Sequence, residues 1–410
     1  MLLTDLAAGH RGVRRTAIRM ADGRALFYCD DPPTGEDPLP PHRLDDPRPL
    51  PDRFAPRPGG GAPVGPQMRY DVLTGDWIPM ATHRMDRTFL PSSDTCPLCP
   101  ARPGAAYQDG EIPDTDYDVA VFENRFPSFL RLPGQDPSEE WLCDGDVLWP
   151  VRHAAGRCEV VCFSSDHSTS LSELSATRMG TIIEAWVDRT VALEAMDGIA
   201  QVYCFENRGP EIGVTLPHPH GQIYGYPTLT PRTAAMMRQA GHYRDRTGRH
   251  LLSDVMEAEL RAGVRVVMQT EHFVAYVPEA ARWPVEVHLA PRRDAAGLAD
   301  LREAERADLA LAYLRLMRGL DRFFVADDGA PIPLPYVSGW HQAPTDPRLR
   351  DLGRLHLQVL STRRAPGKLK YLAGSEAGMG AWISDTIPEA IAERLREALT
   401  EVEEPEVRHV

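Results

Sequence analysis

The order of apolar and polar residues predicts a chain of short strands interrupted by two long helices. Strand-like patterns, which alternate or run apolar over a few residues, occupy residues 157–163, 199–209, 216–227, 283–291, 334–344 and 354–361. Residues 171–195 and 303–324 instead place apolar side chains at helical spacing. Each of these helices follows one strand and precedes two more, so the order strand, loop, helix, strand, strand occurs twice.

A short polar pattern also recurs in the two parts of the chain. The matching triplets are His218, His220 and Gln222 in "LPHPHGQIYGYP", and Arg354, His356 and Gln358 in "RLHLQVLS". Alternate residues of a strand share a face, so each triplet is expected to point to one side of a sheet. We therefore predict an internal duplication whose first copy keeps the chemistry.

The N-terminal region differs from the rest in composition. Residues 16–31 predict a β-hairpin around Asp22-Gly23. Residues 32–66 hold twelve of the 38 prolines and are expected to form an extended connector. The predicted units are an N-terminal hairpin with its proline-rich extension, a first half, a second half and a C-terminal helix or tail, at residues 1–66, 67–227, 228–390 and 391–410.

Composition narrows the classes of function. The 410 residues are 42% hydrophobic and 25% charged, which is typical of a soluble globular protein. The apolar runs are too short for a bilayer, and the start resembles no signal peptide, so a cytoplasmic protein with no membrane partner is expected. A net charge of −14 argues against a nucleic-acid partner.

Seven cysteines, an odd number, indicate reduced thiols rather than a disulfide framework. The spacing of Cys96 and Cys99 in "CPLC" suits two thiolates on one zinc ion, although a redox pair or a merely buried pair stays open. His167 and His218 are the best candidates for the remaining ligands, and the alternative for His167 is a surface residue near a helix start. Such a closed Cys₂His₂ set would be structural. The other cysteines are expected to be structural: Cys29, Cys143, Cys158, Cys162 and Cys204.

His220 is the candidate nucleophile. It lies between Pro219 and Gly221, where the backbone is expected to approach a ligand closely. An unprotonated imidazole can attack phosphorus and form a covalent nucleotidyl-histidine, which splits one transfer into two displacements.

The segments "ENRGPEIGVTLPHPHGQIYGYP", "CPLC", "CFSSDHS", "GWHQAP" and "KLKYLAGSE" together resemble the galactose-1-phosphate uridylyltransferase family of the histidine-triad superfamily. The resemblance covers roughly residues 67–385 and is closest to the actinobacterial type. It implies an α+β fold, a duplicated histidine-triad-like unit whose mainly antiparallel sheet forms a half-barrel flanked by helices. It further implies a homodimer with shared active sites.

The resemblance also implies roles for single residues. His220 would carry the uridylyl group between UDP-glucose and galactose 1-phosphate, and Gln222 would donate to a phosphoryl oxygen. Structural Zn²⁺ would be bound by Cys96, Cys99, His167 and His218. Substrate contacts would come from Arg84, Arg87, Phe122, Asn124, Asn207, Gly213, Thr215, Lys370, Tyr371 and Glu376.

Gln222 favours a transferase over a hydrolase. Related hydrolases carry a third histidine there, whereas glutamine cannot shuttle a proton near pH 7 but can still hold a non-bridging oxygen. Sugar phosphates leave as anions and need little protonation. The alternatives are a related nucleotidyltransferase or phosphorylase with another nucleotide or acceptor, and a zinc-stabilised binding module without activity.

The sequence also departs from the family pattern. Some relatives bind a second metal through one glutamate and three histidines; here His341 and His356 remain, Gln358 replaces a histidine, and no glutamate is evident after the histidine strand. We expect this second site to be absent or very weak. Ser375 and Arg125 stand where aromatic and acidic residues are usual. The basic run with Arg363 and Arg364 is by default a solvated face, and the alternative is a local attraction for anionic substrates.

Overall fold

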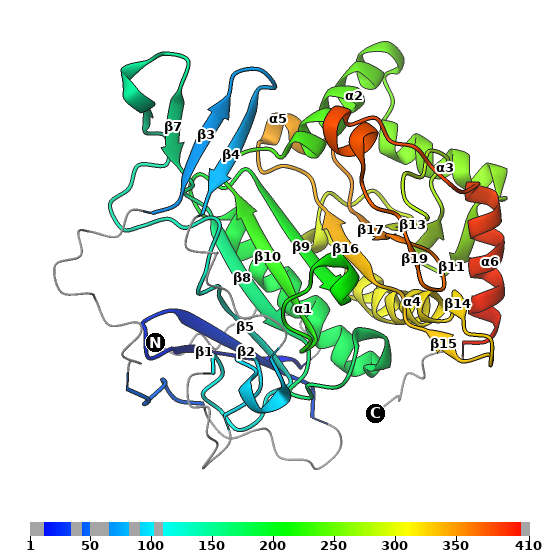
Figure 1. Cartoon of the computed structure of the whole chain (residues 1–410), viewed down its shortest axis with the longest axis horizontal. Coiled ribbons are helices and arrows are strands. Elements are labelled where there is room, and N and C mark those ends of the chain that lie inside the picture. Colours follow the sequence, from blue (N-terminus) through cyan, green and yellow to red (C-terminus); the bar gives the residue numbers. More distant parts are fainter. Residues whose placement is uncertain (1–11, 34–42, 50–64, 82–90, 102–109, 403–410) are drawn as a thin grey trace.

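A single large sheet organises the molecule. The computed structural model describes residues 12–33, 43–49, 65–81, 91–101 and 110–402. Its centre is an eleven-stranded sheet in which all neighbouring strands are antiparallel (Figure 1). From one edge to the other the strands are β1 (Arg14–Arg19), β2 (Ala25–Asp30), β5 (Val119–Glu123), β8 (Arg157–Cys162), β10 (His220–Tyr226), β9 (Gln201–Arg208), β16 (Tyr336–His341), β17 (His356–Ser361), β13 (Val285–Pro291), β12 (Phe273–Tyr276) and β11 (Val266–Gln269).

The strand order confirms the predicted duplication. From the centre of the sheet outward, the strands on one side are β9, β10 and β8, and those on the other side are β16, β17 and β13. In chain order the first half runs β8, helix α1, β9, β10, and the second runs β13, helix α4, β16, β17. The two halves join through the antiparallel pair β9–β16, so they share one continuous sheet. The predicted α+β class with a mainly antiparallel sheet is likewise confirmed.

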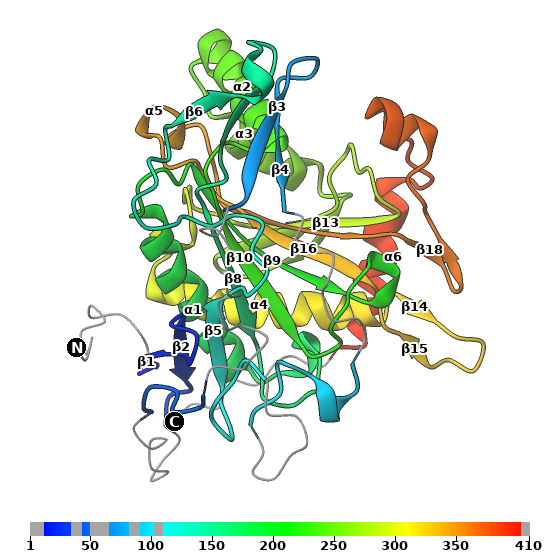
Figure 2. The same ribbon diagram turned by 60° about the vertical axis from the view of Figure 1, so that its left-hand side comes forward.

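Two long helices cover one face of this sheet. Helices α1 (Ala176–Glu194) and α4 (Glu303–Asp321) pack against each other, with the rings of Trp186 and Tyr313 6.0 Å apart (Figure 2). Their apolar sides and the strands form one hydrophobic core, which also takes in helix α6 (Pro388–Thr400). The helical spacing of apolar residues in the sequence predicts this burial because one stripe of each helix must leave water.

Helix ends follow local capping chemistry. Helix α1 starts after Ser175, whose side chain accepts a hydrogen bond from the backbone N–H of Arg178. Glu303 and Glu305 lie in the first turn of α4 and Arg318 in its last, as the helix dipole favours. Helix α1 begins later than the predicted range of residues 171–195, at Ala176. Helix α4 ends earlier than the predicted range of residues 303–324, at Asp321.

Smaller elements surround the large sheet. A four-stranded sheet projects at one side of the molecule (Figure 1), and two pairs of very short strands lie elsewhere. These elements are β4 (Asp76–Met80), β3 (Gln67–Asp71), β7 (Pro150–His153), β6 (Glu140–Leu142), β14 (Phe324–Val325), β15 (Pro331–Ile332), β18 (Arg363–Ala365) and β19 (Lys368–Leu369). The remaining helices are α2 (Pro231–Thr247), α3 (Leu251–Ala262) and α5 (Pro347–Arg350).

The predicted N-terminal hairpin is confirmed as β1 and β2, which extend the large sheet at its edge by pairing with β5. Helix α6 packs on α4 and β11. The division into four units stays a prediction. In the described part of the chain, no helix combines the length and the apolar composition that crossing a membrane requires.

The junction of the halves depends on a glycine. A Cβ atom on Gly339 of β16 would lie 1.9 Å from the hydroxyl oxygen of Tyr203. The Tyr203 ring stacks on Phe205 at 5.2 Å, so it cannot move away without disturbing β9. We expect Gly339→Ala to lower the free energy of unfolding by roughly 2 kcal/mol, the usual cost of overpacking. Urea denaturation of the two proteins measures this difference.

Gly180 of α1 offers a control in which the same substitution should change the free energy of unfolding in the opposite direction. A Cβ atom there would meet no heavy atom within 4 Å, and alanine is a better helix former than glycine by about 1 kcal/mol. Gly180→Ala should therefore stabilise the protein. A stable Gly339→Ala protein would mean that Tyr203 does not restrain the joint between the halves.

Candidate functional site

The histidine strand begins later than the sequence suggests. The chain bends at His218 and Pro219, and β10 starts at His220. His220 and Gln222 share one face of β10, but His218 lies before the strand and is not part of that row. The expectation of three side chains on one strand was wrong for His218 because the bend turns its ring toward the cysteine pair.

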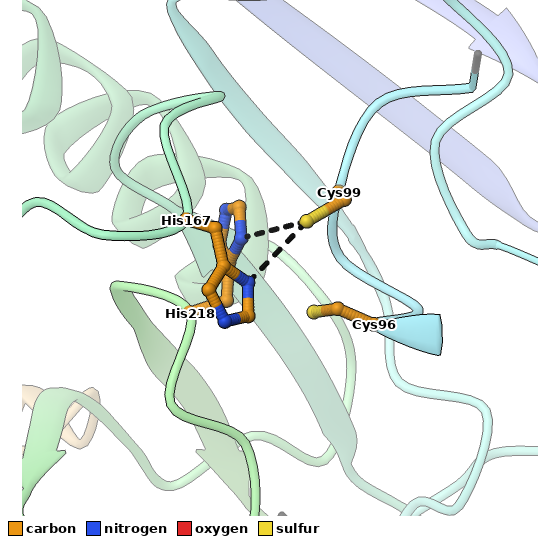
Figure 3. A group of neighbouring side chains, drawn as sticks. All are labelled: Cys96, Cys99, His167 and His218. Carbon is orange, nitrogen blue, oxygen red and sulfur yellow. Dashed lines mark hydrogen bonds between the residues drawn. The ribbon is translucent and has the colours of Figure 1, made fainter. Parts of the chain in front are cut away.

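Four side chains from three parts of the chain meet beside this bend (Figure 3). The Sγ atom of Cys99 lies 3.4 Å from Nδ1 of His167 and 3.6 Å from Nδ1 of His218. With Cys96 added, the four ligand atoms all lie within 4.8 Å of one another. Within the described residues this is the group of metal-binding side chains that is compact enough for one ion.

The surroundings fit a metal ion bound by two sulfurs and two nitrogens. Nε2 of His218 donates to the carbonyl oxygen of Ser164 at 2.8 Å and lies 2.9 Å from the hydroxyl of Tyr117, which leaves Nδ1 as the ligand atom. The pKa of Cys96 is lowered, chiefly by a hydrogen bond from Cys99, and thiolate is the metal-binding form. This donor set is typical of structural zinc.

His220 is held in the protonation state that attack requires. Its Nδ1–H donates to the carbonyl oxygen of His218 at 2.8 Å, so the opposite nitrogen, Nε2, carries the lone pair. Burial lowers the pKa of His220, which keeps the ring neutral near pH 7. The same residue, His218, thus offers its ring to the metal cluster and its backbone oxygen to the nucleophile.

Gly221 has a different role from the one expected. The sequence suggested that it lets a ligand approach the backbone. In the structure a Cβ atom at Gly221 would lie 2.7 Å from the Phe163 ring and 2.8 Å from the carbonyl oxygen of Phe205. The missing side chain therefore makes room for the core beneath the strand, on the face opposite His220.

Gln222 has a fixed amide orientation. Its Oε1 accepts a hydrogen bond from the hydroxyl of Tyr224 at 3.1 Å, so the amide nitrogen is directed as a donor toward the side of the sheet that bears His220. An amide donor beside a nucleophile can hold a negatively charged oxygen of the group under attack.

The second copy repeats this arrangement but uses its groups internally. Nδ1 of His356 contacts the carbonyl oxygen of Arg354 at 3.0 Å, matching the bond made by His220. Gln358, however, accepts from His341 at 3.3 Å and donates to Glu286 at 2.5 Å. Its oxygen and its nitrogen each bond a neighbouring side chain, and Gln358 is 4% exposed, so its amide is oriented within the second half.

Two further histidines of the second half, His341 and His288, lie beside His356. His341 stacks on His356 with ring centres 4.7 Å apart, and His288 lies 5.4 Å from His356. Burial lowers the pKa of His341 to about 3. Glu286 was missed in the sequence because it comes from β13 rather than from the region after the histidine strand. The expected weakness of a second metal site stays a prediction.

A pocket opens next to His220. It is lined by Asn207 at the end of β9 and by the segment that follows it, including Val214. Gly213, with φ of +81°, closes the turn Pro210–Ile212 in a conformation that favours glycine. Thr215 follows this turn and is half-buried. The structure thus brings Asn207 and His220 to one pocket and places Gly213 and Thr215 on the adjoining turn.

Phe122 and Asn124 are not part of the lining of this pocket. Phe122 is 1% exposed and packs in the core with Val160 and Cys162, so it presents almost no surface to a ligand in this conformation. The side-chain oxygen of Asn124 accepts from the backbone N–H of Phe126 at 2.8 Å. Arg84 and Arg87 lie outside the described residues.

The three predicted contacts near the C-terminus do not reach the pocket of their own chain. Lys370 is 3% exposed and lies 3.3 Å from the carboxylate of Glu376. Tyr371 is 77% exposed. Residues 371–387 form an arm that projects away from β8 and β10 in Figure 2.

The basic run also differs from the expectation, because Arg363 is buried and paired with Glu211 and Arg364 is paired with Asp385.

Sequence reasoning missed Glu206, a buried acid beside the pocket. It is 5% exposed and accepts a hydrogen bond from the hydroxyl of Tyr336 at 2.9 Å. Burial raises the pKa of Glu206 from 4.5 to about 7. A single glutamate on a strand gives no sign of this in the sequence, since the shift arises from the packing of β16 and α4 around it.

This acid makes stability depend on pH. Because the folded-state pKa lies above the unfolded one, its contribution is fully present below about pH 4.5 and is lost as pH rises through about 7. Relative to the wild type, Glu206→Gln should gain up to about 3 kcal/mol between pH 5 and pH 8. Urea denaturation of both proteins at the two pH values measures the change. A difference that is the same at both would contradict the raised pKa.

The fold and the site define a class: a duplicated α+β protein in which a histidine with a fixed tautomer lies beside a Cys₂His₂ cluster. The sequence matches "Galactose-1-phosphate uridyl transferase, N-terminal domain" over residues 62–230 and the corresponding C-terminal domain over residues 236–407. The chain therefore belongs to the galactose-1-phosphate uridyl transferase family.

Relatives support the same conclusion. A galactose-1-phosphate uridylyltransferase of Streptomyces lividans is 41% identical over 94% of this chain and 98% of its own. The enzyme of that name from Thermotoga maritima is 34% identical over 82% of this chain and 99% of its own. A solved uridylyltransferase structure superposes with a TM-score of 0.70 at 33% identity, covering 82% of this chain and 99% of that one.

Proposed function

We propose that the protein moves a uridylyl group from UDP-glucose to galactose 1-phosphate through a covalent intermediate on His220. The observation that carries this proposal is the bond from Nδ1 of His220 to the backbone oxygen of His218, at 2.8 Å, which leaves Nε2 as an unprotonated nucleophile at the mouth of the pocket. The shared name of relatives that match nearly the whole chain supports the nucleotide and the acceptor.

The reaction proceeds in two displacements. Nε2 of His220 attacks the α-phosphorus of UDP-glucose and forms a P–N bond, and the bond to the bridging oxygen breaks as glucose 1-phosphate leaves with the electron pair. A phosphate oxygen of galactose 1-phosphate then attacks the same phosphorus and displaces the imidazole, giving UDP-galactose. Glucose 1-phosphate leaves as a stable anion, and the imidazole leaves as a neutral ring because its proton stays on Nδ1. No general acid is therefore required.

Gln222 would stabilise the charge that develops at phosphorus. Its amide N–H, directed by the hydrogen bond from Tyr224, is placed to donate to a non-bridging oxygen. Asn207 and the turn ending at Gly213 would contact the phosphates, and Thr215 would border them. Arg84 and Arg87 are proposed for the nucleotide phosphates, and Phe122 and Asn124 for the uracil and ribose side.

We also propose that Cys96, Cys99, His167 and His218 bind one Zn²⁺. A bound ion with four protein ligands is closed, so it would act as a crosslink between these segments rather than as a Lewis acid. Its effect on the reaction would be to fix His218, whose carbonyl oxygen orients His220.

A homodimer with shared active sites is proposed from the arm of residues 371–387. The arm exposes Tyr371, Met379 and Ile387 by 77, 82 and 68%, and it projects away from the sheet of its own chain (Figure 2). Exposed apolar side chains of this number favour a protein partner. A second copy would receive the arm, and Lys370, Tyr371 and Glu376 would then approach the hexose phosphate of that copy.

The test is a half-reaction with UDP-glucose labelled at the α-phosphorus and no acceptor. The expected result is acid-labile, base-stable label on the protein with equal release of glucose 1-phosphate, and removal of the label by galactose 1-phosphate. Label that galactose 1-phosphate leaves in place would require another acceptor. Folded, zinc-loaded protein without label would overturn the uridylyl transfer.

A further inference from the structure

An ion pair between the halves fixes the turn at the edge of the pocket. Nη2 of Arg363, at the start of β18, lies 2.6 Å from Oε1 of Glu211. Nη1 of the same guanidinium donates to the carbonyl oxygen of Pro333 at 2.7 Å. The arginine is 8% exposed and the Glu211 side chain 28%. The buried guanidinium therefore cannot lose its carboxylate partner without being left poorly solvated.

Glu211 lies in the turn Pro210–Ile212, which Gly209 and Gly213 bracket. A Cβ atom at Gly209 would meet the Glu211 carboxylate and Pro335, each at 2.8 Å. The turn is thus packed directly on the second half. It leads into Val214, which lines the pocket together with His220, so a shift of the turn alters the wall of the pocket.

The other end of the contact leads to the arm. Arg363 pairs with Leu369 across the hairpin of β18 and β19. The next residue, Lys370, bonds through its backbone N–H to Thr362 at 2.6 Å and pairs with Glu376 at 3.3 Å. One guanidinium therefore joins the turn at the pocket to the base of the segment that carries Lys370.

We propose that Arg363 is a positioning residue for the uridylyl transfer, acting through Glu211 on the turn that borders the phosphates of the nucleotide. This inference rests on the proposed function. Arg363 itself would not touch the substrate, since the residue is buried and its two terminal nitrogens bond Pro333 and Glu211. The pair would hold the turn in the geometry that the first displacement needs. The hairpin of β18 and β19 would fix the position of the turn relative to the base of the arm.

The test compares Glu211→Gln, Arg363→Gln and the double variant in the labelled half-reaction. Each single variant should lower the kcat/KM of the half-reaction for UDP-glucose, on the order of tenfold, because a contact that orders the site is lost. The double variant should lose no more than either single variant, because both remove the same contact. Exchanging the charges, with Glu211→Arg and Arg363→Glu together, should restore part of the rate.

Arg265 provides a control of the same kind. It lies just before β11 at the far edge of the sheet and pairs with Glu259 at 2.9 Å and with Glu389 at 2.6 Å. Arg265→Gln should label at the wild-type rate. Single variants that are less stable yet label normally, or losses that add in the double variant, would overturn the positioning role. Wild-type protein that takes no label would instead refute the proposed function.

Discussion

Replacing His220 with alanine is expected to abolish uridylyl transfer, with a loss of roughly 10⁴-fold or more in the rate of the half-reaction. The change removes the only atom proposed to bond phosphorus. It leaves His218 and its ring contacts to Cys99 and Ser164 in place. Metal content should therefore equal that of the wild type, and the free energy of unfolding should change by about 1 kcal/mol, as for most half-buried sites.

The chain contains its own matched control for this variant. His356 occupies the equivalent position in the second copy and makes the same bond to the backbone oxygen two residues earlier. It is more deeply buried and stacks on His341, so His356→Ala should cost more stability. Folded His356→Ala protein should nevertheless take up label. Loss of label in both variants would mean that the two copies cooperate in the chemistry.

Replacing Cys96 with serine is expected to act on the metal and on stability first. A hydroxyl is a poor ligand for zinc, and a structural metal contributes to folding, so the variant should lose most of its metal and at least about 5 °C of its unfolding midpoint. Metal analysis and thermal unfolding of the purified proteins measure both quantities. Transfer should fall as well, because His218 then orients His220 less firmly.

Two comparisons separate this result from a general defect. Cys204→Ala removes a buried thiol that lies in the main core, outside the cluster, and should keep its metal while losing modest stability. A chelator should lower the midpoint of the wild type toward that of Cys96→Ser and leave the variant itself unchanged. If His220→Ala lost as much metal as Cys96→Ser, the assignment of the nucleophile and of the metal ligands would be wrong.

The large elements could be predicted because apolar periodicity determines them. Helices α1 and α4 each bury a long stripe, and the strands around them are rich in apolar residues. Helix α2 went unpredicted, since it buries only three side chains, Thr233, Met237 and Ala240, and its pattern is mostly polar. The duplication could be predicted from short matching segments. The residues of these segments keep the same spacing because they occupy equivalent positions in the sheet, although the rest of the two halves differs in sequence.

The site was predictable where residues lie close in sequence and less so where the fold brings them together. The spacing of Cys96 and Cys99 indicated a metal, and the structure adds both predicted histidines to the pair. The bend at His218 was missed because alternation alone does not reveal where a strand starts. Arg363 was misread as a solvated residue or a substrate attractor, since its partner Glu211 lies 152 positions away in the chain.

The central pairing of β9 with β16 has a consequence for synthesis of the chain. Every strand of the first half precedes Pro231, so the strands β1, β2, β5, β8, β10 and β9 are all synthesised before β16 exists. Until residues 336–341 emerge, β9 is an open edge whose backbone N–H and C=O groups have no strand to pair with. The nascent protein must remain in that state while more than a hundred further residues are added. Slow translation or truncation after the first half would therefore expose an edge suited to aggregation with other incomplete chains.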